Sequence, residues 1–213
     1  MTRRIPLFPL PGVVLLPGTL LPLHIFEARY RAMVADALAG DRTIGMAMIK
    51  PGWERGEEPP EIHAVGGAGE IIESERLEDG RYNILLEARF RYRVLSETPP
   101  DPYRVADVEE IPSVPFPDSR GQARSLEIAR ALFAEVLGRL ALPPLPDEDL
   151  APERLASELA LRLRYAPAEL QSLLEEDSLS RRFETLIGRM LEWRGRIRFL
   201  EPFRPKEMDP RRN

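Results

Sequence analysis

The sequence predicts an α+β protein, with a mainly β-structured first part that contains one early helix and a helical second part. Up to residue 111 the apolar residues fall in short runs or alternate with polar residues, which is typical of strands. One stretch in this part, from Phe26 to Leu38, instead shows the three-to-four-residue spacing of a helix. After Pro112, Pro115 and Pro117 the helical spacing dominates, so we expect the boundary at this stiff connection.

Composition narrows the class of protein. The chain has 213 residues, of which 43% are hydrophobic, enough for a sizeable core. It contains no cysteine, which excludes disulfide bonds and thiolate metal sites. Its formal net charge is −5, and residues 1–118 hold more acidic than basic side chains, so a nucleic-acid partner is not favoured.

The apolar opening stretch, residues 5–30, resembles a signal peptide or membrane anchor in composition only. It contains five prolines, and each would cost about 3 kcal/mol inside a helix. We therefore expect extended chain, no membrane partner and a cytoplasmic location. Pro11-Gly12 and Pro17-Gly18 predict two type II turns, and the apolar run Val13–Leu16 between them predicts a buried strand.

The remaining strands of the first part are expected in order along the chain, with a loop at residues 51–60. The predicted strands are 43–50, an extended stretch over 62–77, 81–95 after an Asp-Gly hairpin turn, and 103–111. The glycines at 66, 67 and 69 do not form a dinucleotide fingerprint, because no third glycine follows at the required spacing and no helix opens there. We interpret them as positions where two backbones approach closely.

Three arginines alternate along the strand at 81–95. Arg89, Arg91 and Arg93 are separated by apolar residues, so all three should lie on one face. A basic strip for an acidic peptide or a phosphate is one interpretation. A solvated outer face paired with the abundant glutamates is the interpretation we favour.

Four helices are predicted in the second part. Pro152 and Pro167 are well placed in the first turns of two of them. The last helix should begin near Ser178 and carries an apolar seam at alternating spacings of four and three, formed by Leu179, Phe183, Leu186, Met190, Trp193, Ile197 and Leu200. We expect this seam to brace the two halves of the chain, and a dimeric coiled coil is the alternative.

Catalytic and metal-binding patterns are missing from the sequence. The two histidines, His24 and His63, have no neighbouring ligands, so no metal site is expected. The only lysines, Lys50 and Lys206, do not belong to a phosphate-binding loop, and no Gly-x-Ser-x-Gly nucleophile motif occurs. We therefore expect neither a cofactor nor an enzymatic activity.

The opening stretch resembles a known family. Residues 6–18 (PLFPLPGVVLLPG) and 21–30 (LPLHIFEARY) are similar to the start of the Lon protease N-terminal, substrate-binding domain, a module that cereblon shares. The similarity continues at Ile44-Gly45, Pro102-Tyr103 and residues 173–181. Ala28 departs from the family, which often has proline there. The resemblance implies a PUA-like mixed β-barrel followed by a helical bundle.

Boundaries and function follow from this resemblance as expectations. The barrel should occupy residues 1–117, the helical bundle 118–203 and a frayed tail 204–213. We expect a stand-alone, non-catalytic protein that binds unfolded or exposed polypeptide segments, as an adaptor in proteolysis or in protein quality control. An RNA-binding PUA-like module is the alternative, and a small-ligand pocket in the barrel mouth is a third possibility. The peptide-binding candidates are Trp53, Met46 and Met48.

Overall fold

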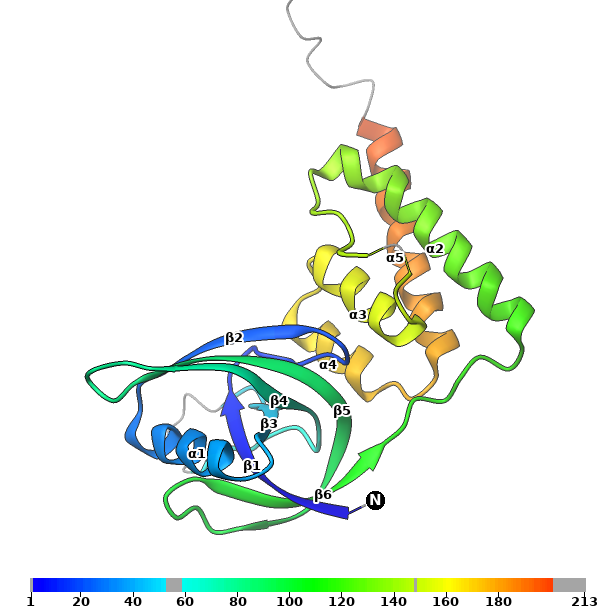
Figure 1. Cartoon of the computed structure of the whole chain (residues 1–213). Coiled ribbons are helices and arrows are strands. Elements are labelled where there is room, and N and C mark those ends of the chain that lie inside the picture. Colours follow the sequence, from blue (N-terminus) through cyan, green and yellow to red (C-terminus); the bar gives the residue numbers. More distant parts are fainter. Residues whose placement is uncertain (1, 53–58, 148, 201–213) are drawn as a thin grey trace, which may run out of the picture.

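The computed structural model describes residues 2–52, 59–147 and 149–200, and in them the fold is α+β as predicted. The strands are β1 (Thr2–Leu10), β2 (Leu20–Ile25), β3 (Thr43–Met48), β4 (Val65–Arg76), β5 (Tyr82–Thr98) and β6 (Arg104–Ile111). The helices are α1 (Ala28–Ala39), α2 (Ser119–Leu140), α3 (Pro152–Arg162), α4 (Pro167–Glu175) and α5 (Leu179–Leu200). Figure 1 shows the strands and α1 forming one part of the molecule, with α2 to α5 rising from it.

The strands form a six-stranded mixed sheet in the order β2-β5-β4-β3-β1-β6. Only β1 and β3 pair in parallel, and the other pairs are antiparallel. Strand β5 is 17 residues long, and its second half also pairs with β6. Strands β5 and β6 are therefore neighbours as well, although they stand apart in the strand order. Helix α1 packs against this sheet and shares a hydrophobic core with it.

The prediction of a strand at Val13–Leu16 was wrong. This segment is buried at Leu15 and Leu16, but it joins no strand ladder. It crosses against β4 instead, where a Cβ atom added to Gly67 would lie 2.0 Å from the Leu15 carbonyl oxygen. The prediction that these glycines mark a close backbone approach is thereby confirmed.

Both Pro-Gly turns on either side of that segment have the predicted backbone conformation. Gly12 has φ +70° and Gly18 has φ +73°, in the region that favours glycine. The second turn lies against α3, because a Cβ atom at Gly18 would lie 2.9 Å from Cγ of Arg154. The turns therefore place the buried crossing segment between the sheet and the helices.

The three arginines of β5 do not share one environment. Arg89 is exposed and pairs with Glu70 and Glu87 at 2.9 and 2.7 Å, as the solvated-face interpretation predicts. Arg91 contradicts that interpretation, since its side chain is only 1% exposed. The end of α4 and the segment after it cover the sheet at this point.

Arg91 lies at the centre of a polar cluster that joins the sheet to the helices, which we call the junction cluster. Its guanidinium donates to the carbonyl oxygens of Leu174 (2.8 Å) and Pro112 (3.1 Å) and to the Asp177 carboxylate (3.1 Å). Arg182 of α5 donates to the Glu176 carbonyl at 2.7 Å, which Arg91 also contacts at 3.3 Å. One buried N–H of each guanidinium, Nε of Arg91 and Nη2 of Arg182, has no partner among the described residues.

The remaining contacts of the junction cluster come from α3 and the connection before α2. Glu153 accepts from Arg182 at 3.3 Å and from the Ser113 hydroxyl. Burial lowers the pKa of the Arg182 guanidinium, and the neighbouring Arg91 charge lowers it further. The connection itself bridges to the start of α5, because Leu179 N–H donates to the Val114 carbonyl at 3.0 Å.

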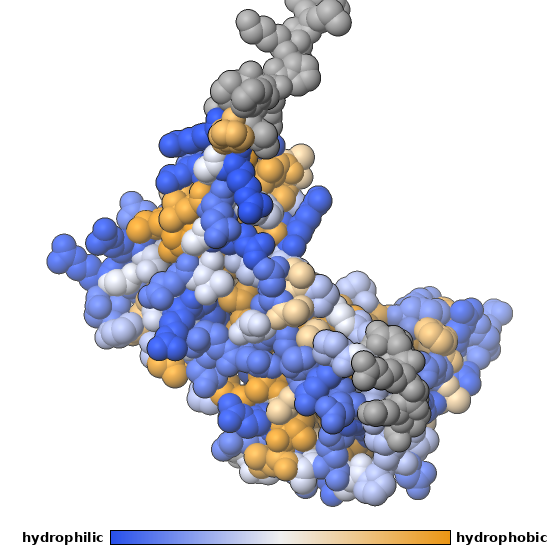
Figure 2. Space-filling view, turned by 180° about the vertical axis from the view of Figure 1, so that it is seen from behind, coloured by the Kyte–Doolittle hydropathy of each residue, from blue (hydrophilic) through white to orange (hydrophobic). Residues whose placement is uncertain are grey.

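Helices α2 to α5 share one hydrophobic core. Pro152 and Pro167 stand in the first turns of α3 and α4, as predicted. The core includes Leu132, Phe133 and Val136 of α2, Leu155 and Leu159 of α3, and Phe183, Leu186 and Met190 of α5. It also takes in Leu16 and Val65 from the first part of the chain. Seen from the opposite side, hydrophobic residues reach the surface among hydrophilic ones on both the helical part and the sheet part (Figure 2).

The seam of α5 packs within the chain. Leu179, Phe183, Leu186 and Met190 are buried, and Trp193 and Ile197 pack beside them against the same core. Helix α5 contacts α2 and α3, so its seam is used mainly inside the helical part. The brace between the two halves is made at its first turn, by Arg182 in the junction cluster.

We predict that Gly18→Val lowers the free energy of unfolding by about 1–3 kcal/mol, because a β-branched residue resists positive φ and its Cβ would press on Arg154. Gly12→Val is the matched control, since its added Cβ would lie 3.6 Å from its nearest neighbour, Pro167. Chemical denaturation should show the larger loss at Gly18. Equal midpoints for Gly18→Val and the wild type would contradict the turn assignment.

We predict that Phe183→Ala destabilises the protein by about 3–5 kcal/mol, because a fully buried aromatic ring that contacts Phe116 is removed. Leu191→Ala on the exposed side of the same helix should change little. Because the seam is covered within the chain, the melting temperature should not depend on protein concentration. A melting temperature that rises with concentration would instead indicate a dimeric coiled coil.

We predict that Arg91→Met costs about 3 kcal/mol or more, since buried carbonyl oxygens of the junction cluster would lose their donor. Arg89→Met is the control on the same face, and its exposed ion pairs should contribute less than about 1 kcal/mol. Urea denaturation of the two variants compares them directly. Similar losses would show that the buried contacts of Arg91 do not stabilise the junction.

Candidate functional site

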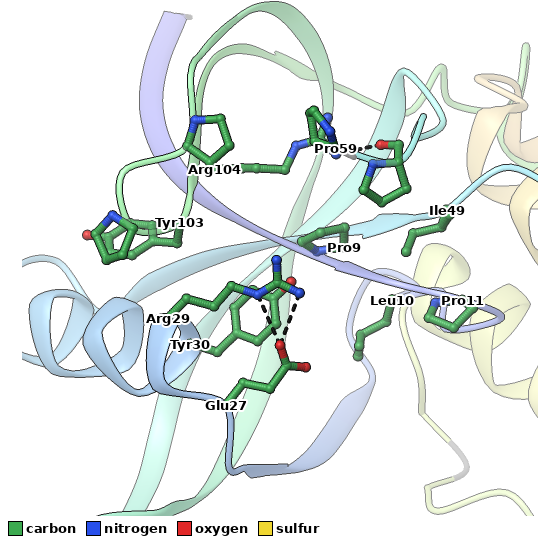
Figure 3. A pocket seen from close by; sticks show the side chains of 13 residues that line it. Pro9, Leu10, Pro11, Glu27, Arg29, Tyr30, Ile49, Pro59, Tyr103 and Arg104 are labelled. Atoms are coloured by element: carbon green, nitrogen blue, oxygen red, sulfur yellow. Dashed lines mark hydrogen bonds and ion pairs between the residues drawn. The ribbon is translucent and has the colours of Figure 1, made fainter. Parts of the chain in front are cut away.

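An apolar pocket of about 470 Å³ opens where the end of β1, the start of α1 and the β5–β6 connection meet. Its volume is within the range of about 300–1,000 Å³ that is common for ligand sites. The lining residues are Pro9, Leu10, Pro11, Glu27, Arg29, Tyr30, Ile49, Pro59, Pro60, Pro100, Pro102, Tyr103 and Arg104 (Figure 3). Prolines and two tyrosines supply most of this wall.

Local sequence explains why these segments end at the pocket. Pro9 and Pro11 limit the hydrogen bonds that β1 can continue to make, so the strand stops at Leu10. Glu27 has an extended backbone and precedes the first residue of α1, which places Arg29 and Tyr30 in the first turn of the helix. The prolines of this rim have no side-chain rotamer freedom to lose, so they add little entropy cost when a ligand binds.

Glu27, Arg29 and Tyr30 form one side of the pocket. Nε and Nη2 of Arg29 both lie 3.0 Å from Oε2 of Glu27, and the guanidinium carbon lies 4.6 Å from the centre of the Tyr30 ring. Figure 3 shows Arg29, Tyr30 and Glu27 grouped together on this side. The cation therefore lies over an aromatic face while its charge is balanced by a carboxylate.

Tyr103 and Arg104 form the other side. The Tyr103 hydroxyl donates to the Asp36 carboxylate at 2.7 Å, and burial together with this hydrogen bond raises the pKa of Tyr103 to about 12. Arg104 is 8% exposed, donates to the Pro60 carbonyl at 2.7 Å and pairs with Glu97 at 2.6 Å. These bonds fix the position of both side chains.

The charged side chains that line the pocket, Glu27, Arg29 and Arg104, are engaged in the ion pairs above. Within residues 2–52, 59–147 and 149–200, no group of three or more histidine, aspartate or glutamate side chains could hold a metal ion. What the pocket offers is apolar surface.

The structure places two of the three predicted binding residues, Met46 and Met48, away from the pocket. Trp53 lies outside the described residues. Met46 and Met48 lie on β3 with exposed fractions of 2% and 6%, so a peptide docking on the surface of this conformation would not meet their side chains. The pocket residues were not predicted as a site, although Glu27, Arg29 and Tyr30 belong to the stretch that carries the family resemblance.

The two histidines take separate roles. His24 on β2 contacts Oδ1 of Asn83 through Nδ1 at 2.7 Å and receives a hydrogen bond from Arg81 at Nε2, 3.2 Å away. His63 contacts Glu175 at the end of α4 through Nδ1 at 3.0 Å. Neither faces the other, so they form no joint site.

Comparison with known proteins places these features in a family. The model of the ATP-dependent protease La (LON) substrate-binding domain matches residues 4–192, which includes most of the sheet, the pocket and the helices. The chain belongs to the Lon substrate-binding domain family. Lon protease 2 of Syntrophobacter fumaroxidans is 30% identical over 82% of this chain, and Lon protease of Dictyoglomus thermophilum is 29% identical over 84%.

The Lon relatives are much longer, since the chain spans 22% and 23% of these two proteins. Among solved structures, the Lon N-terminal domain protein from Xanthomonas campestris is similar with a TM-score of 0.64 and 26% identity, over 87% of this chain and 98% of that one. The N-terminal domain of Mycobacterium avium complex Lon protease shares the fold with a TM-score of 0.65 and 20% identity, over 88% and 98%. None of the helices described in this Lon-family chain combines the length and apolar character needed to cross a membrane.

We predict that Tyr103→Phe flattens the pH dependence of stability between about pH 10 and 12. In that range the tyrosine is ionised in the unfolded chain but still protonated in the folded one, so the free energy of unfolding falls as pH rises. Removing the hydroxyl removes this contribution. Urea midpoints at the two ends of the range should differ less for the variant than for the wild type, and an equal difference would contradict the assigned pKa.

Proposed function

We propose that this chain binds apolar segments of other polypeptides in the pocket between β1, α1 and the β5–β6 connection. The observation that carries the proposal is an apolar, proline-lined pocket whose charged groups are already paired. An apolar side chain that enters it would gain burial without breaking a strong polar interaction. The family description, which names a substrate-binding domain, supports the same class of ligand.

The neighbourhood of the pocket favours a polypeptide ligand over an isolated small molecule. Phe26 stands directly before Glu27 and is 61% exposed, so it extends the apolar surface beyond the pocket mouth. A chain with one side chain in the pocket could cover Phe26 with another. Proline-rich walls are also stiff, which reduces the entropy lost on binding.

We infer that the protein acts without catalysis, as an adaptor in proteolysis or in protein quality control. The match to the substrate-binding part of Lon supports this role, as does the absence of a phosphate-binding loop from the sequence.

We also infer that the strands, with the additional pairing between β5 and β6, form a PUA-like barrel over residues 1–117, followed by a helical bundle over 118–203. The alternative of RNA binding finds no support in the acidic composition.

Fluorescence anisotropy with a labelled, permanently unfolded protein, such as reduced and carboxymethylated lactalbumin, tests the proposed function. Tyr103→Ala should weaken binding about ten-fold or more, because it removes an aromatic wall of the pocket. Tyr103→Phe, the matched control, keeps the ring and should bind like the wild type. Equal affinities for all three proteins would show that the pocket is not the binding site.

The same assay separates polypeptide from RNA. Apolar binding should change little with salt, whereas RNA binding should weaken steeply as counterions compete. If the protein binds single-stranded RNA with an affinity that falls steeply as salt rises, and does not bind the unfolded protein, RNA binding would be favoured over polypeptide binding.

A further inference from the structure

A second exposed apolar surface lies on β2, on the face opposite the one that packs into the core. Leu21, Leu23 and Ile25 point toward the core shared with α1. The alternate residues Leu20, Pro22 and His24 therefore point outward, and Leu20 is 51% exposed. The His24 ring stacks with Phe26, with 6.4 Å between the ring centres, so the outward row continues to that residue.

The neighbouring strands extend this row into a strip. In the strand register Pro22 lies opposite Leu85 of β5, and Leu85 lies opposite Glu73 of β4. A register shift between Ile71 and Glu73 leaves Ile72 as an extra residue, and its side chain is 38% exposed. Such a bulge re-aims a side chain that would otherwise alternate into the core. We call Leu20, Pro22, Leu85, Ile72 and Phe26 the outer strip.

Acidic side chains surround the outer strip. Glu70, Glu73 and Glu75 of β4 and Glu87 of β5 belong to the same outward rows. The cations Arg89 and Arg81 lie nearby and are already paired: Arg89 with Glu70 and Glu87, and Arg81, which also reaches His24, with Asp79. Glu73 makes no ion pair with any residue that the structure describes, and Glu75 receives only a hydrogen bond from Asn83. Figure 2 shows hydrophilic side chains predominating around the end of the β4–β5 hairpin.

The edge of the sheet beside the strip is a poor place for strand addition. Strand β2 is the end strand in the sheet order, and among the described strands it pairs only with β5. Pro22 stands in its middle and has no N–H, so a strand added there would lack a central hydrogen bond. The backbone edge therefore offers less to a ligand than the apolar and acidic side chains on the face of the strip.

We propose that the outer strip binds a basic, apolar polypeptide segment lying across the face of β2, β5 and β4. Apolar side chains of the segment would cover Leu20, Leu85 and Ile72, while its lysines or arginines would face Glu73 and Glu75. This charge complementarity selects against acidic segments of equal hydrophobicity.

This inference rests on the proposed function only for the class of ligand. The strip shares no residue with the pocket, although Phe26 lies next to Glu27 at the pocket mouth. A polypeptide could thus contact both surfaces, with the strip adding a preference for basic sequence.

Two short fluorescent peptides test the proposal on the full chain, one alternating leucine with lysine and one alternating leucine with glutamate. The basic peptide should bind at least about ten-fold more tightly. Leu20→Ser combined with Ile72→Ser should weaken its binding about ten-fold, because both exposed contacts are lost. Leu95→Ser is the matched control, since Leu95 is a 54% exposed leucine at a bulge on a different strand, β5.

Charge reversal gives the second arm of the experiment. Glu73→Lys should weaken binding of the basic peptide and strengthen binding of the acidic one, whereas Glu109→Lys, at an exposed position of β6, should change neither. Equal binding of both peptides, or equal effects of the strip variants and their controls, would overturn the proposal. Peptide binding that is lost with Tyr103→Ala but kept in the strip variants would assign the peptide to the pocket alone. A dimer in light scattering that the Leu20 and Ile72 substitutions dissociate would assign the strip to a second copy.

Discussion

The buried guanidinium of Arg91 is the contact on which the arrangement of sheet and helices depends. The last carbonyl groups of a helix have no partner within that helix, and those at the end of α4 lie against the sheet. Arg91 supplies the missing donors from β5, and Arg182 supplies another from α5. One planar, permanently charged group thus satisfies carbonyl oxygens from segments far apart in the sequence. The cost of burying it is offset only because these partners are all present.

The pocket does not depend on this cluster but on three segments that meet there: the end of β1, the start of α1 and the β5–β6 connection. Strand β1 ends in prolines, α1 begins with a paired Glu27 and Arg29, and the β5–β6 connection brings Tyr103 against Asp36 on α1. Contacts within the chain hold each of these segments in place around the pocket. The junction cluster joins the helices to the sheet and shares no residue with the lining of this pocket.

Much of the fold was predictable from local chemistry. Proline at the first turns of α3 and α4, glycine in the two Pro-Gly turns and the four-three spacing of α5 each follow from residues close in sequence. The errors came from contacts between distant residues. The local sequence predicts Arg91 to be a surface residue, but α4 covers it in the fold. It likewise predicts a strand at Val13–Leu16, but this segment crosses the glycines of β4 without joining the sheet. The pocket was missed for the same reason, because its prolines and tyrosines come from separate segments that only the fold brings together.

The proline in β2 has a consequence for the behaviour of the protein in a crowded solution. A domain whose partners are unfolded chains meets many segments that seek a strand to pair with, and an open, regular edge would template their growth into fibrils. Pro22 interrupts the donors of that edge at its middle while leaving the outward side chains in place. On the proposed function, the outward side chains of β2 would contact an unfolded chain while the edge beside them stays a poor template for strand growth.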